Sequence, residues 1–452
     1  MVHPDNPAKS RFIPAQNMKY TQTIDYLFTR LPMFSKIGAA AFKKDLTNTI
    51  SLCKFLGDPQ TKFKSIHIGG TNGKGSTSHM LAAIFQTAGY KTGLYTSPHL
   101  KDFRERIKIN GDMIAEDFVI DFVEKIKPLI EEKEPSFFEI TVAMAFEYFA
   151  QQHVDIAIIE VGLGGRLDST NIILPELSII TNIGYDHMNM LGNTLDKIAY
   201  EKAGIIKKNI PVIIGEDQPA IHQVFVDKAL QENAPLHFAD KDRFVADWKF
   251  EKHELVAEVT STHSNEKQYY HLDLTGIYQL KNLVTVLEAF NMLQQRGFSI
   301  AAVHIQKGLR QVKKLTGLHG RWETIHENPS IVIDVGHNEE GIRQIVRQIE
   351  ITDHEALHII LGMVKDKEIE KILALLPKYG NYYFTKAQIP RALPEDELAQ
   401  KAKTIGLSGN HYPNVQSALQ AAIHHANKKD LIIICGSVFV VGEVDVNDIR
   451  ET

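Results

Sequence analysis

The stretch Gly69–Ser76, GGTNGKGS, combines glycines, a lysine and hydroxyl side chains at a spacing that suits phosphate binding. Ile66 and Ile68 end an apolar run before it, and a helical pattern follows Lys74. A glycine-rich turn between a strand and a helix directs backbone N–H groups at an anion, and the helix N-terminus adds favourable partial charge. We therefore expect Lys74 to lie against the β and γ phosphates of a nucleotide. The alternative is a tight glycine turn beside a solvated lysine.

This loop departs from the usual phosphate-binding pattern at its metal-binding position. The usual pattern places Ser or Thr directly after the lysine, and that hydroxyl binds Mg²⁺. Here Gly75 follows Lys74, and Ser76 comes one position late. Ser76 is one candidate to replace the hydroxyl, and Ser97, just past the strand-like run KTGLYTS, is another. Ser97 could equally be a turn residue before Pro98.

Two further polar residues follow apolar runs that read as buried strands. Glu160 ends the run in VDIAIIEVG, where a carboxylate is costly unless it is paired or bound to metal. His187 follows LSIITNIG, although a lone histidine is more often a surface or core residue. Parallel sheets gather ligands at the carboxyl ends of their strands, so we expect Glu160 and His187 near the phosphate loop. The glycines after Glu160 are a weak dinucleotide motif, because Leu167 occupies its last glycine position.

Strand-like runs alternate with helical patterns along most of the chain, which predicts parallel βαβ units. Residues 236–275 instead resemble antiparallel strands with a polar face, and a helix is expected over 282–297. The charged, glycine-containing region around 309–323 resembles a domain joint, after which the βαβ pattern restarts. The predicted fold is α/β, with a larger phosphate-loop domain on a mostly parallel sheet and a smaller Rossmann-like C-terminal domain. The expected bounds are 1–310, a linker at 311–319, and 320–452.

Composition excludes several classes of protein. Apolar residues make up 44% of the 452 residues and charged residues 23%, values typical of a globular protein. A net charge of −5 argues against nucleic-acid binding as the main activity. No run approaches the roughly 18 apolar residues of a membrane span. The two cysteines, Cys53 and Cys435, do not suggest a disulfide framework. We expect a cytoplasmic protein.

Seven segments together resemble the folylpolyglutamate synthases, in particular the bacterial kind that often doubles as dihydrofolate synthase, within the Mur ligase superfamily. They run in family order from residue 69 to 443: GGTNGKGS, YTSPHL, IIEVGLGGRLDSTN, DHMNMLGNTLDKIAYEKAGIIK, GRWE, DVGHN and CGSVFVVGE. The folate branch of that superfamily is similar in having Gly after the lysine, so the displaced Ser76 fits the resemblance.

The resemblance implies a role for each matching position. Binding of ATP is implied for Asn72, Gly73, Lys74, Gly75, Ser76, Asn282, Arg321 and Asp334. Two Mg²⁺ ions are implied near Ser76, Ser97, Glu160, His187 and Lys202, with a carbamate on Lys202. Pterin contacts are implied for Ser136, Phe137, Phe138, Glu139, Leu167, Asp168 and Ser169, and glutamate contacts for His337 and Ser437. Catalytic roles are implied for Lys74, His187, Lys202 and His337. Without the resemblance, Lys202 reads as a solvated helix lysine.

The implied activity is an ADP-forming ligase that joins L-glutamate to a folate, or to dihydropteroate, through an acyl phosphate. The implied partners are these small molecules alone, with neither nucleic acid nor membrane, and the chain is expected to be a monomer. A cell-wall Mur ligase is a rival, but such enzymes have a further N-terminal domain for the UDP sugar. A nucleotide-dependent switch is a second rival, and it would not need Glu160, His187 and Lys202 as well as the loop.

Overall fold

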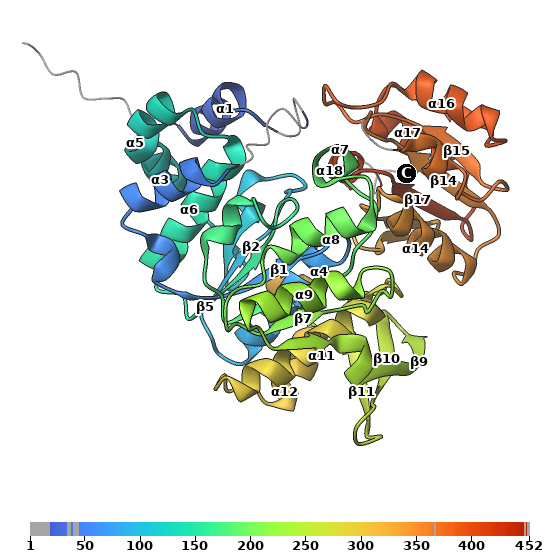
Figure 1. Ribbon diagram of the computed structural model, residues 1–452. Helices are drawn as coiled ribbons and strands as arrows, with labels where there is room; N and C mark the ends of the chain where they lie inside the picture. The colour runs from blue at the N-terminus through green and yellow to red at the C-terminus, as the bar shows by residue number, and fades with distance from the viewer. Residues whose placement is uncertain (1–18, 34–37, 39–44, 366–367, 447–448, 450–452) are drawn as a thin grey trace, which may run out of the picture.

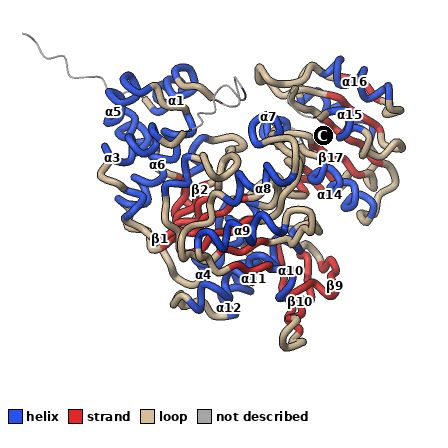
Figure 2. Tube along the Cα trace, in the orientation of Figure 1, coloured by secondary structure: helices blue, strands red, loops and turns tan. Residues whose placement is uncertain are grey.

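The computed structural model describes residues 19–33, 38, 45–365, 368–446 and 449. Strands in this part of the chain form three sheets, and helices cover the two larger sheets (Figure 1). The C-terminal sheet and its helices, orange to red, lie beside the rest of the molecule, and Figure 2 gives the same arrangement by secondary structure. None of the helices formed by the described residues has both the length and the apolar character needed to cross a membrane.

The large sheet has the strand order β4-β3-β2-β5-β1-β6-β7-β8. Its strands are β1 (Lys64–Gly69), β2 (Thr92–Tyr95), β3 (Ile107–Ile109), β4 (Asp112–Met113), β5 (Ile156–Glu160), β6 (Leu177–Ile180), β7 (Val212–Ile214) and β8 (Leu236–Phe238). Neighbours from β2 to β8 pair in parallel, while β3 and β4 pair antiparallel. Every residue of β5 and β6 is buried, as expected for central strands covered on both faces.

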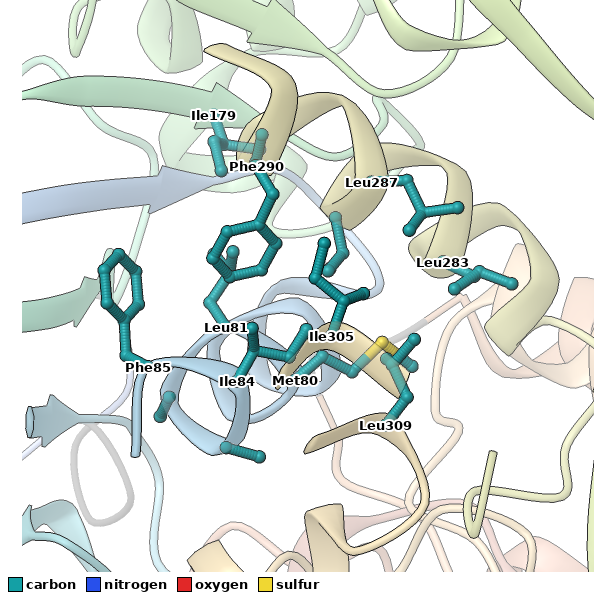
Figure 3. Close-up of a cluster of buried hydrophobic side chains, with 14 of the residues drawn as sticks. Met80, Leu81, Ile84, Phe85, Ile179, Leu283, Leu287, Phe290, Ile305 and Leu309 are labelled. Atoms are coloured by element: carbon teal, nitrogen blue, oxygen red, sulfur yellow. The ribbon is translucent and has the colours of Figure 1, made fainter. Parts of the chain in front are cut away.

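Helices cover both faces of this sheet. On one face lie α4 (Lys74–Thr87), α11 (Gln279–Gln295), α12 (Ala302–Leu309) and the short α13 (Val312–Thr316). Figure 3 shows side chains of α4, α11 and α12 meeting Ile179 of β6 in one core. On the other face lie α1 (Tyr20–Arg30), α3 (Thr47–Phe55), α5 (Glu116–Lys133) and α6 (Phe137–Gln151), with α8 (Leu195–Ala203) and α9 (His222–Glu232) over β6 and β7. Shorter elements are α7 (Met188–Leu191), α10 (Ala239–Asp242), η2 (Pro59–Thr61), η3 (Phe103–Arg106) and η4 (Ser169–Ile172).

The middle of the chain forms a separate antiparallel sheet from β9 (Arg243–Glu251), β10 (Glu254–Ser261) and β11 (Lys267–Leu272). One of its faces buries Leu255 and Ala257 in the core of the large sheet, and exposed Tyr269 pairs with Glu258 on the other face. The antiparallel prediction is confirmed for this sheet. It is wrong for 236–238, because β8 pairs in parallel with β7; three residues are too few to show a strand period.

The C-terminal sheet has the order β12-β13-β17-β14-β15-β16. Its strands are β12 (Glu323–Glu327), β13 (Ser330–Ile333), β14 (Leu357–Leu361), β15 (Asn381–Phe384), β16 (Gly409–His411) and β17 (Leu431–Cys435). Its helices are α14 (Glu339–Glu350), α15 (Ile369–Leu373), α16 (Glu395–Thr404), α17 (Val415–His425) and α18 (Val438–Gly442). The four predicted strands are confirmed. The two edge strands, β12 and β16, have no fully buried residues and gave no apolar signal.

The span predicted as a linker contains a helix. Val312 of α13 is buried in the same core as α4, and Leu318 follows it there. The next strand, β12, begins at Glu323 and pairs with β13 of the C-terminal sheet. The division at 311–319 remains a prediction.

Candidate active site

A cavity of about 740 Å³ lies where the carboxyl ends of strands from the two larger sheets face each other. Its walls include the segments that follow β1, β2, β5 and β6 in the large sheet and those that follow β13 and β17 in the C-terminal sheet. Every predicted site residue lines this cavity: Asn72, Gly73, Lys74, Gly75, Ser76, Ser97, Ser136, Phe137, Phe138, Glu139, Glu160, Leu167, Asp168, Ser169, His187, Lys202, Asn282, Arg321, Asp334, His337 and Ser437. The sequence therefore predicted residues that lie together, although the role of each is still a prediction.

The phosphate loop is the predicted turn between β1 and α4, and neighbouring strands fix its shape. Gly70 has φ +132°, and a Cβ there would lie 1.9 Å from the Thr181 hydroxyl, so only glycine fits. The N–H groups of Thr71 and Asn72 donate to the main-chain and side-chain oxygens of Asn182, at 2.8 and 2.9 Å. The Lys74 ammonium curls back over the loop and donates to the Gly70 carbonyl at 3.2 Å. These bonds fix the shape of a glycine-rich turn at the start of a helix, which is where phosphate-binding loops occur.

Gly75 makes room for two charged groups that meet at the start of α4. A Cβ at this position would lie 3.3 Å from a terminal nitrogen of Arg321 and 3.8 Å from both carboxylate oxygens of Glu160. The missing side chain therefore lets a guanidinium that follows the C-terminal joint approach the phosphate loop. A side chain at this position would have to displace the Arg321 guanidinium by a few tenths of an ångström.

The Ser76 hydroxyl faces α11 through a residue that the sequence analysis missed. Ser76 is buried, and its oxygen accepts a hydrogen bond from the Gln279 side-chain amide at 3.1 Å. Asn282 in turn donates to the Gln279 carbonyl oxygen at 2.7 Å. Asn282 also lies so close to Gly73 that a Cβ there would be 2.3 Å from its Oδ1. Gln279 went unnoticed because the predicted helix began at residue 282.

Glu160 places a buried carboxylate beside this loop. Its side chain lines the cavity, and the residue is only 5% exposed. The Ser97 N–H donates to its Oε2 at 3.2 Å. Burial raises the pKa of Glu160, and the nearby charge of Lys74 acts in the opposite direction. Ser76, Ser97 and His187 line the same cavity as Glu160, and a carboxylate together with hydroxyl oxygens is a donor set that fits Mg²⁺.

Lys202 is buried in α8, in contrast to the solvated lysine that its helix pattern alone suggested. Its Nζ donates to the Gly70 carbonyl at 2.7 Å. Burial, and then the charge of Lys74, lower the pKa of Lys202 to about 7. A large share of its amine is therefore neutral near neutral pH. His187, at φ +50°, lies in the left-handed region and caps α7, with its Nε2 3.8 Å from Asp186 Oδ2.

Asp334 anchors the C-terminal joint against the large sheet. One carboxylate oxygen accepts the Tyr278 hydroxyl at 2.7 Å and the Trp322 N–H at 2.8 Å, and the other accepts the Gly336 N–H at 2.8 Å. Burial raises the pKa of Asp334, which these bonds and the charge of Arg321 oppose. Tyr278 was not predicted, since nothing in the sequence pairs an aromatic residue with a carboxylate 56 positions away.

The two predicted glutamate contacts lie at strand ends of the C-terminal sheet. His337 has its Nδ1 2.9 Å from the Val335 carbonyl and its Nε2 3.3 Å from Asp186 Oδ2. Both ring nitrogens thus face oxygen atoms, which fix the orientation of the ring. The Ser437 hydroxyl accepts from the Phe439 N–H at 3.1 Å and caps α18.

The predicted pterin region forms an aromatic wall of the cavity. Phe137 packs against Phe28, with ring centroids 5.4 Å apart. Ser136 and Glu139 form a capping box at the start of α6, and the second Glu139 oxygen is buried with no hydrogen-bond partner among the described residues. Asp168 accepts the N–H groups of Leu163 and Thr170 at 2.8 and 3.0 Å, so it fastens the glycine-rich loop.

Arg106 adds a buried cation to this wall that the sequence analysis did not single out. It is 7% exposed, its Nε donates to His99 Nδ1 at 2.8 Å, and its guanidinium lies 5.4 Å from the Phe137 ring centroid. No carboxylate lies within ion-pair distance of it in the described part of the chain. A charged residue directly before the apolar strand β3 was the available signal.

Comparison with known proteins gives matches to both halves of the cavity. Residues 68–290 match the Mur ligase middle domain, and residues 320–438 match the Mur ligase glutamate ligase domain. A dihydrofolate synthase/folylpolyglutamate synthase of Bacillus subtilis is 33% identical over 438 residues, covering 94% of this chain and 98% of that protein. A folylpolyglutamate synthase of Lacticaseibacillus casei is 30% identical over 438 residues, covering 94% and 98%.

Solved structures agree over nearly the full length. The Escherichia coli FolC structure with DHPP and ADP has a TM-score of 0.82 at 26% identity, covering 96% of this chain and 99% of that one. The Mycobacterium tuberculosis folylpolyglutamate synthase with ADP has a TM-score of 0.83 at 29% identity, covering 94% and 97%. A Yersinia pestis relative, solved with AMPPNP and a Mn ion, has a TM-score of 0.79 at 26% identity, covering 96% and 98%.

The two sheets, the phosphate loop and the cavity between them define an ATP-dependent ligase of the Mur type. Within that superfamily, this chain belongs to the folylpolyglutamate synthase/dihydrofolate synthase family, whose members are ADP-forming ligases. The expectation from its seven sequence segments is confirmed.

Proposed function

We propose that this chain uses ATP to join L-glutamate to the γ-carboxyl of a reduced folate, and to the carboxyl of dihydropteroate, releasing ADP and phosphate. The observation that carries the proposal is the cavity in which Lys74, Glu160 and Lys202 of the large-sheet half meet Arg321 and Asp334 of the C-terminal half. The B. subtilis relative carries both activities in its name, and the E. coli structure contains DHPP and ADP.

Charge repulsion is the first obstacle in this reaction. A carboxylate must approach the γ-phosphate, and each pair of like charges about 4 Å apart repels by roughly 4 kcal/mol at an effective dielectric near 20. Lys74, which lies over the loop carbonyls, and Arg321, which approaches Gly75, are two protein cations at this point. We infer that they offset the repulsion while the carboxylate attacks the γ-phosphorus and ADP leaves. The resulting acyl phosphate is then open to attack by the neutral amine of glutamate.

The residues that fit Mg²⁺ lie on the phosphate side of the cavity. Ser76, Ser97, Glu160 and His187, with Lys202 as a carbamate, would hold two such ions, and bound Mg²⁺ supplies positive charge at the phosphate oxygens. An ammonium is a poor metal ligand, but a neutral amine reacts with CO₂ to give a carbamate and a proton. The lowered pKa of Lys202 supports this modification.

The glutamate substrate is assigned to the C-terminal side of the cavity. His337 and Ser437 lie at the ends of β13 and β17 and line that side. Because the Val335 carbonyl and the Asp186 carboxylate fix the ring of His337, we infer that it helps to position the glutamate substrate. The aromatic wall at Phe137 and Phe138 is assigned to the pterin ring. We also infer a monomer, on the family resemblance alone.

A steady-state assay with the purified full chain tests the proposal. ADP release is measured with tetrahydrofolate and with dihydropteroate, each with and without L-glutamate. We expect release only when ATP, glutamate and one pterin substrate are all present, with a product one glutamate heavier by mass spectrometry. Release that needs no pterin substrate, or nucleotide binding without turnover, would contradict the proposal and favour a nucleotide-dependent switch.

A further inference from the structure

Asn338 is held by four hydrogen bonds, which is all that one carboxamide can make. Its Oδ1 accepts the Gly341 N–H at 2.9 Å and the Asn72 side-chain N–H at 3.2 Å. Its Nδ2 donates to Asn72 Oδ1 at 3.0 Å and to Asp186 Oδ2 at 3.3 Å. The residue is 4% exposed, so these bonds form almost out of contact with solvent.

The orientation of this amide follows from its partners. The Gly341 N–H can only donate, which places the oxygen of Asn338 toward α14, and the Asp186 carboxylate requires the nitrogen on the other side. Asn72 then pairs with it in the complementary orientation. The two amides form a reciprocal pair of hydrogen bonds.

The three partners of Asn338 belong to separate parts of the cavity. Gly341 lies in the first turn of α14, which follows β13 and His337. Asn72 belongs to the phosphate loop after β1, and Asp186 directly precedes His187 after β6. Asp186 Oδ2 is also 3.3 Å from His337 Nε2, so the same carboxylate contacts both neighbouring residues of the C-terminal sheet. One side chain thus joins the phosphate loop, the His187 segment and the glutamate end of the cavity.

We propose that Asn338 is a positioning residue that locks the C-terminal sheet onto the phosphate loop, so that the acyl phosphate and glutamate meet in one geometry. The inference rests on the proposed ligase reaction. Loss of the amide removes the reciprocal partner of the Asn72 carboxamide and one of the donors to Asp186, and it lowers the population of the joined arrangement. The nucleotide cradle itself stays, because Asn182 and Thr181 hold the loop independently of Asn338.

The test separates this role from helix capping. Asn338→Ser keeps a side chain able to cap α14 but removes the reciprocal pair. Asn414→Ser is the matched control, since Asn414 caps α17 by the same type of bond, to Ser417 N–H at 2.8 Å, and does not line the cavity. We measure kcat, KM for glutamate, ADP affinity by calorimetry, and the urea midpoint. For Asn338→Ser we expect kcat/KM for glutamate to fall by about tenfold or more, with ADP affinity changed less than about threefold.

A second variant tests the same contact with a side chain that still caps α14, so that a loss of activity cannot be attributed to loss of the cap. Asn338→Asp also caps α14, but its carboxylate faces Asp186 Oδ2 and Asn72 Oδ1, so we expect a larger loss than for Ser. The proposal is overturned if Asn338→Ser matches Asn414→Ser in kcat and KM, if Asn338→Asp retains full activity, or if ADP affinity falls as far as kcat/KM. Wild-type protein with no pterin-dependent turnover would contradict the proposed function instead.

Discussion

Gly75 shows how one missing side chain changes the chemistry of a phosphate loop. The position directly after the lysine ordinarily presents a hydroxyl to the metal. In this chain two charged groups from outside the loop, the Arg321 guanidinium and the Glu160 carboxylate, lie within 3.3 and 3.8 Å of where a Cβ would be. A cation and a carboxylate therefore lie next to the position where a hydroxyl is usual. The loop is best understood together with the residues that approach it.

We therefore expect that restoring the usual hydroxyl at position 75 lowers turnover. We expect Gly75→Ser, and also Gly75→Ala, to lower turnover by about tenfold or more, because the new side chain pushes Arg321 out of place. Gly380→Ala is the control, since a Cβ there has no neighbour closer than 3.4 Å. Turnover of Gly75→Ser at or above the wild-type rate would show that the loop accepts a hydroxyl at its usual position.

The modification of Lys202 by CO₂ should depend on pH near neutrality, whereas that of a solvated lysine would not. Its pKa lies near 7, so the neutral amine becomes more abundant as the pH rises through 7. We expect a ¹³C carbamate signal from labelled bicarbonate that grows between about pH 6 and 8. Lys202→Ala should be slower by on the order of a hundredfold, be partly rescued by a small carboxylate, and lack the signal.

The exposed Lys197 in the same helix supplies the control for this prediction. Lys197→Ala should keep both the turnover and the carbamate signal of the wild type. If Lys202→Ala works at the wild-type rate, a carbamate at this position has no essential role.

Sequence predicts individual site residues when their chemistry conflicts with their surroundings. Glu160 was identifiable because a carboxylate ends an apolar strand, and Lys74 because glycines surround it. Lys202 has the ordinary spacing of an exposed helix residue, and only the family resemblance singled it out. Gln279 and Asn338 were missed because an amide is equally common on a surface; their importance comes from partners more than 200 residues away.

At the scale of elements, the site is built from strand ends. The alternation of apolar runs and helical patterns placed β1, β2, β5, β6, β13 and β17 correctly, and each is followed by a segment that lines the cavity. Strands buried on both faces give the strongest pattern, whereas the short or exposed β8, β12 and β16 give almost none. The hydrophobic pattern thus predicts the core of each sheet better than its edges.

The contact between β11 and α13 should make stability depend on pH. Asp273 accepts the Lys313 N–H at 2.8 Å, but its other oxygen is buried without a partner among the described residues. Burial raises the pKa of Asp273 to about 6. An acid whose folded pKa is raised is neutral in both states below about pH 4. It penalises the folded state increasingly as the pH rises to 6, and fully above that.

We therefore expect Asp273→Asn to stabilise the protein at pH 7.5 by on the order of 1 kcal/mol, and to have little effect near pH 4. Urea midpoints at the two pH values measure the difference. Asp121→Asn, at an exposed position of α5, should show no such dependence. An equal effect of Asp273→Asn at both pH values would mean that its carboxyl does not titrate as the burial indicates.

At the scale of the whole molecule, the cavity has two halves, and each half carries only some of the residues to which the proposed reaction assigns a role. The large sheet supplies the phosphate loop, Glu160 and Lys202, and the residues after the joint supply Arg321, Asp334 and His337. Asp334 bonds to Tyr278 and Asn338 bonds to Asn72, so the two halves also fix each other's polar groups. Water must be kept from an acyl phosphate, and a cavity walled by both halves suits that need.

A fragment that ends at residue 318 should consequently fold without catalysing ligation. Val312 and Leu318 are buried in the core with α4, so this end point keeps the core that a cut at 310 would open. We expect cooperative unfolding by circular dichroism, together with folate- and glutamate-dependent ADP release lower by on the order of a thousandfold or more. The full chain with Arg321→Ala and Asp334→Ala is the matched control, because it keeps the second sheet but removes its two predicted ATP contacts. Release by the fragment near the rate of the full chain would place the complete active site on the large sheet alone.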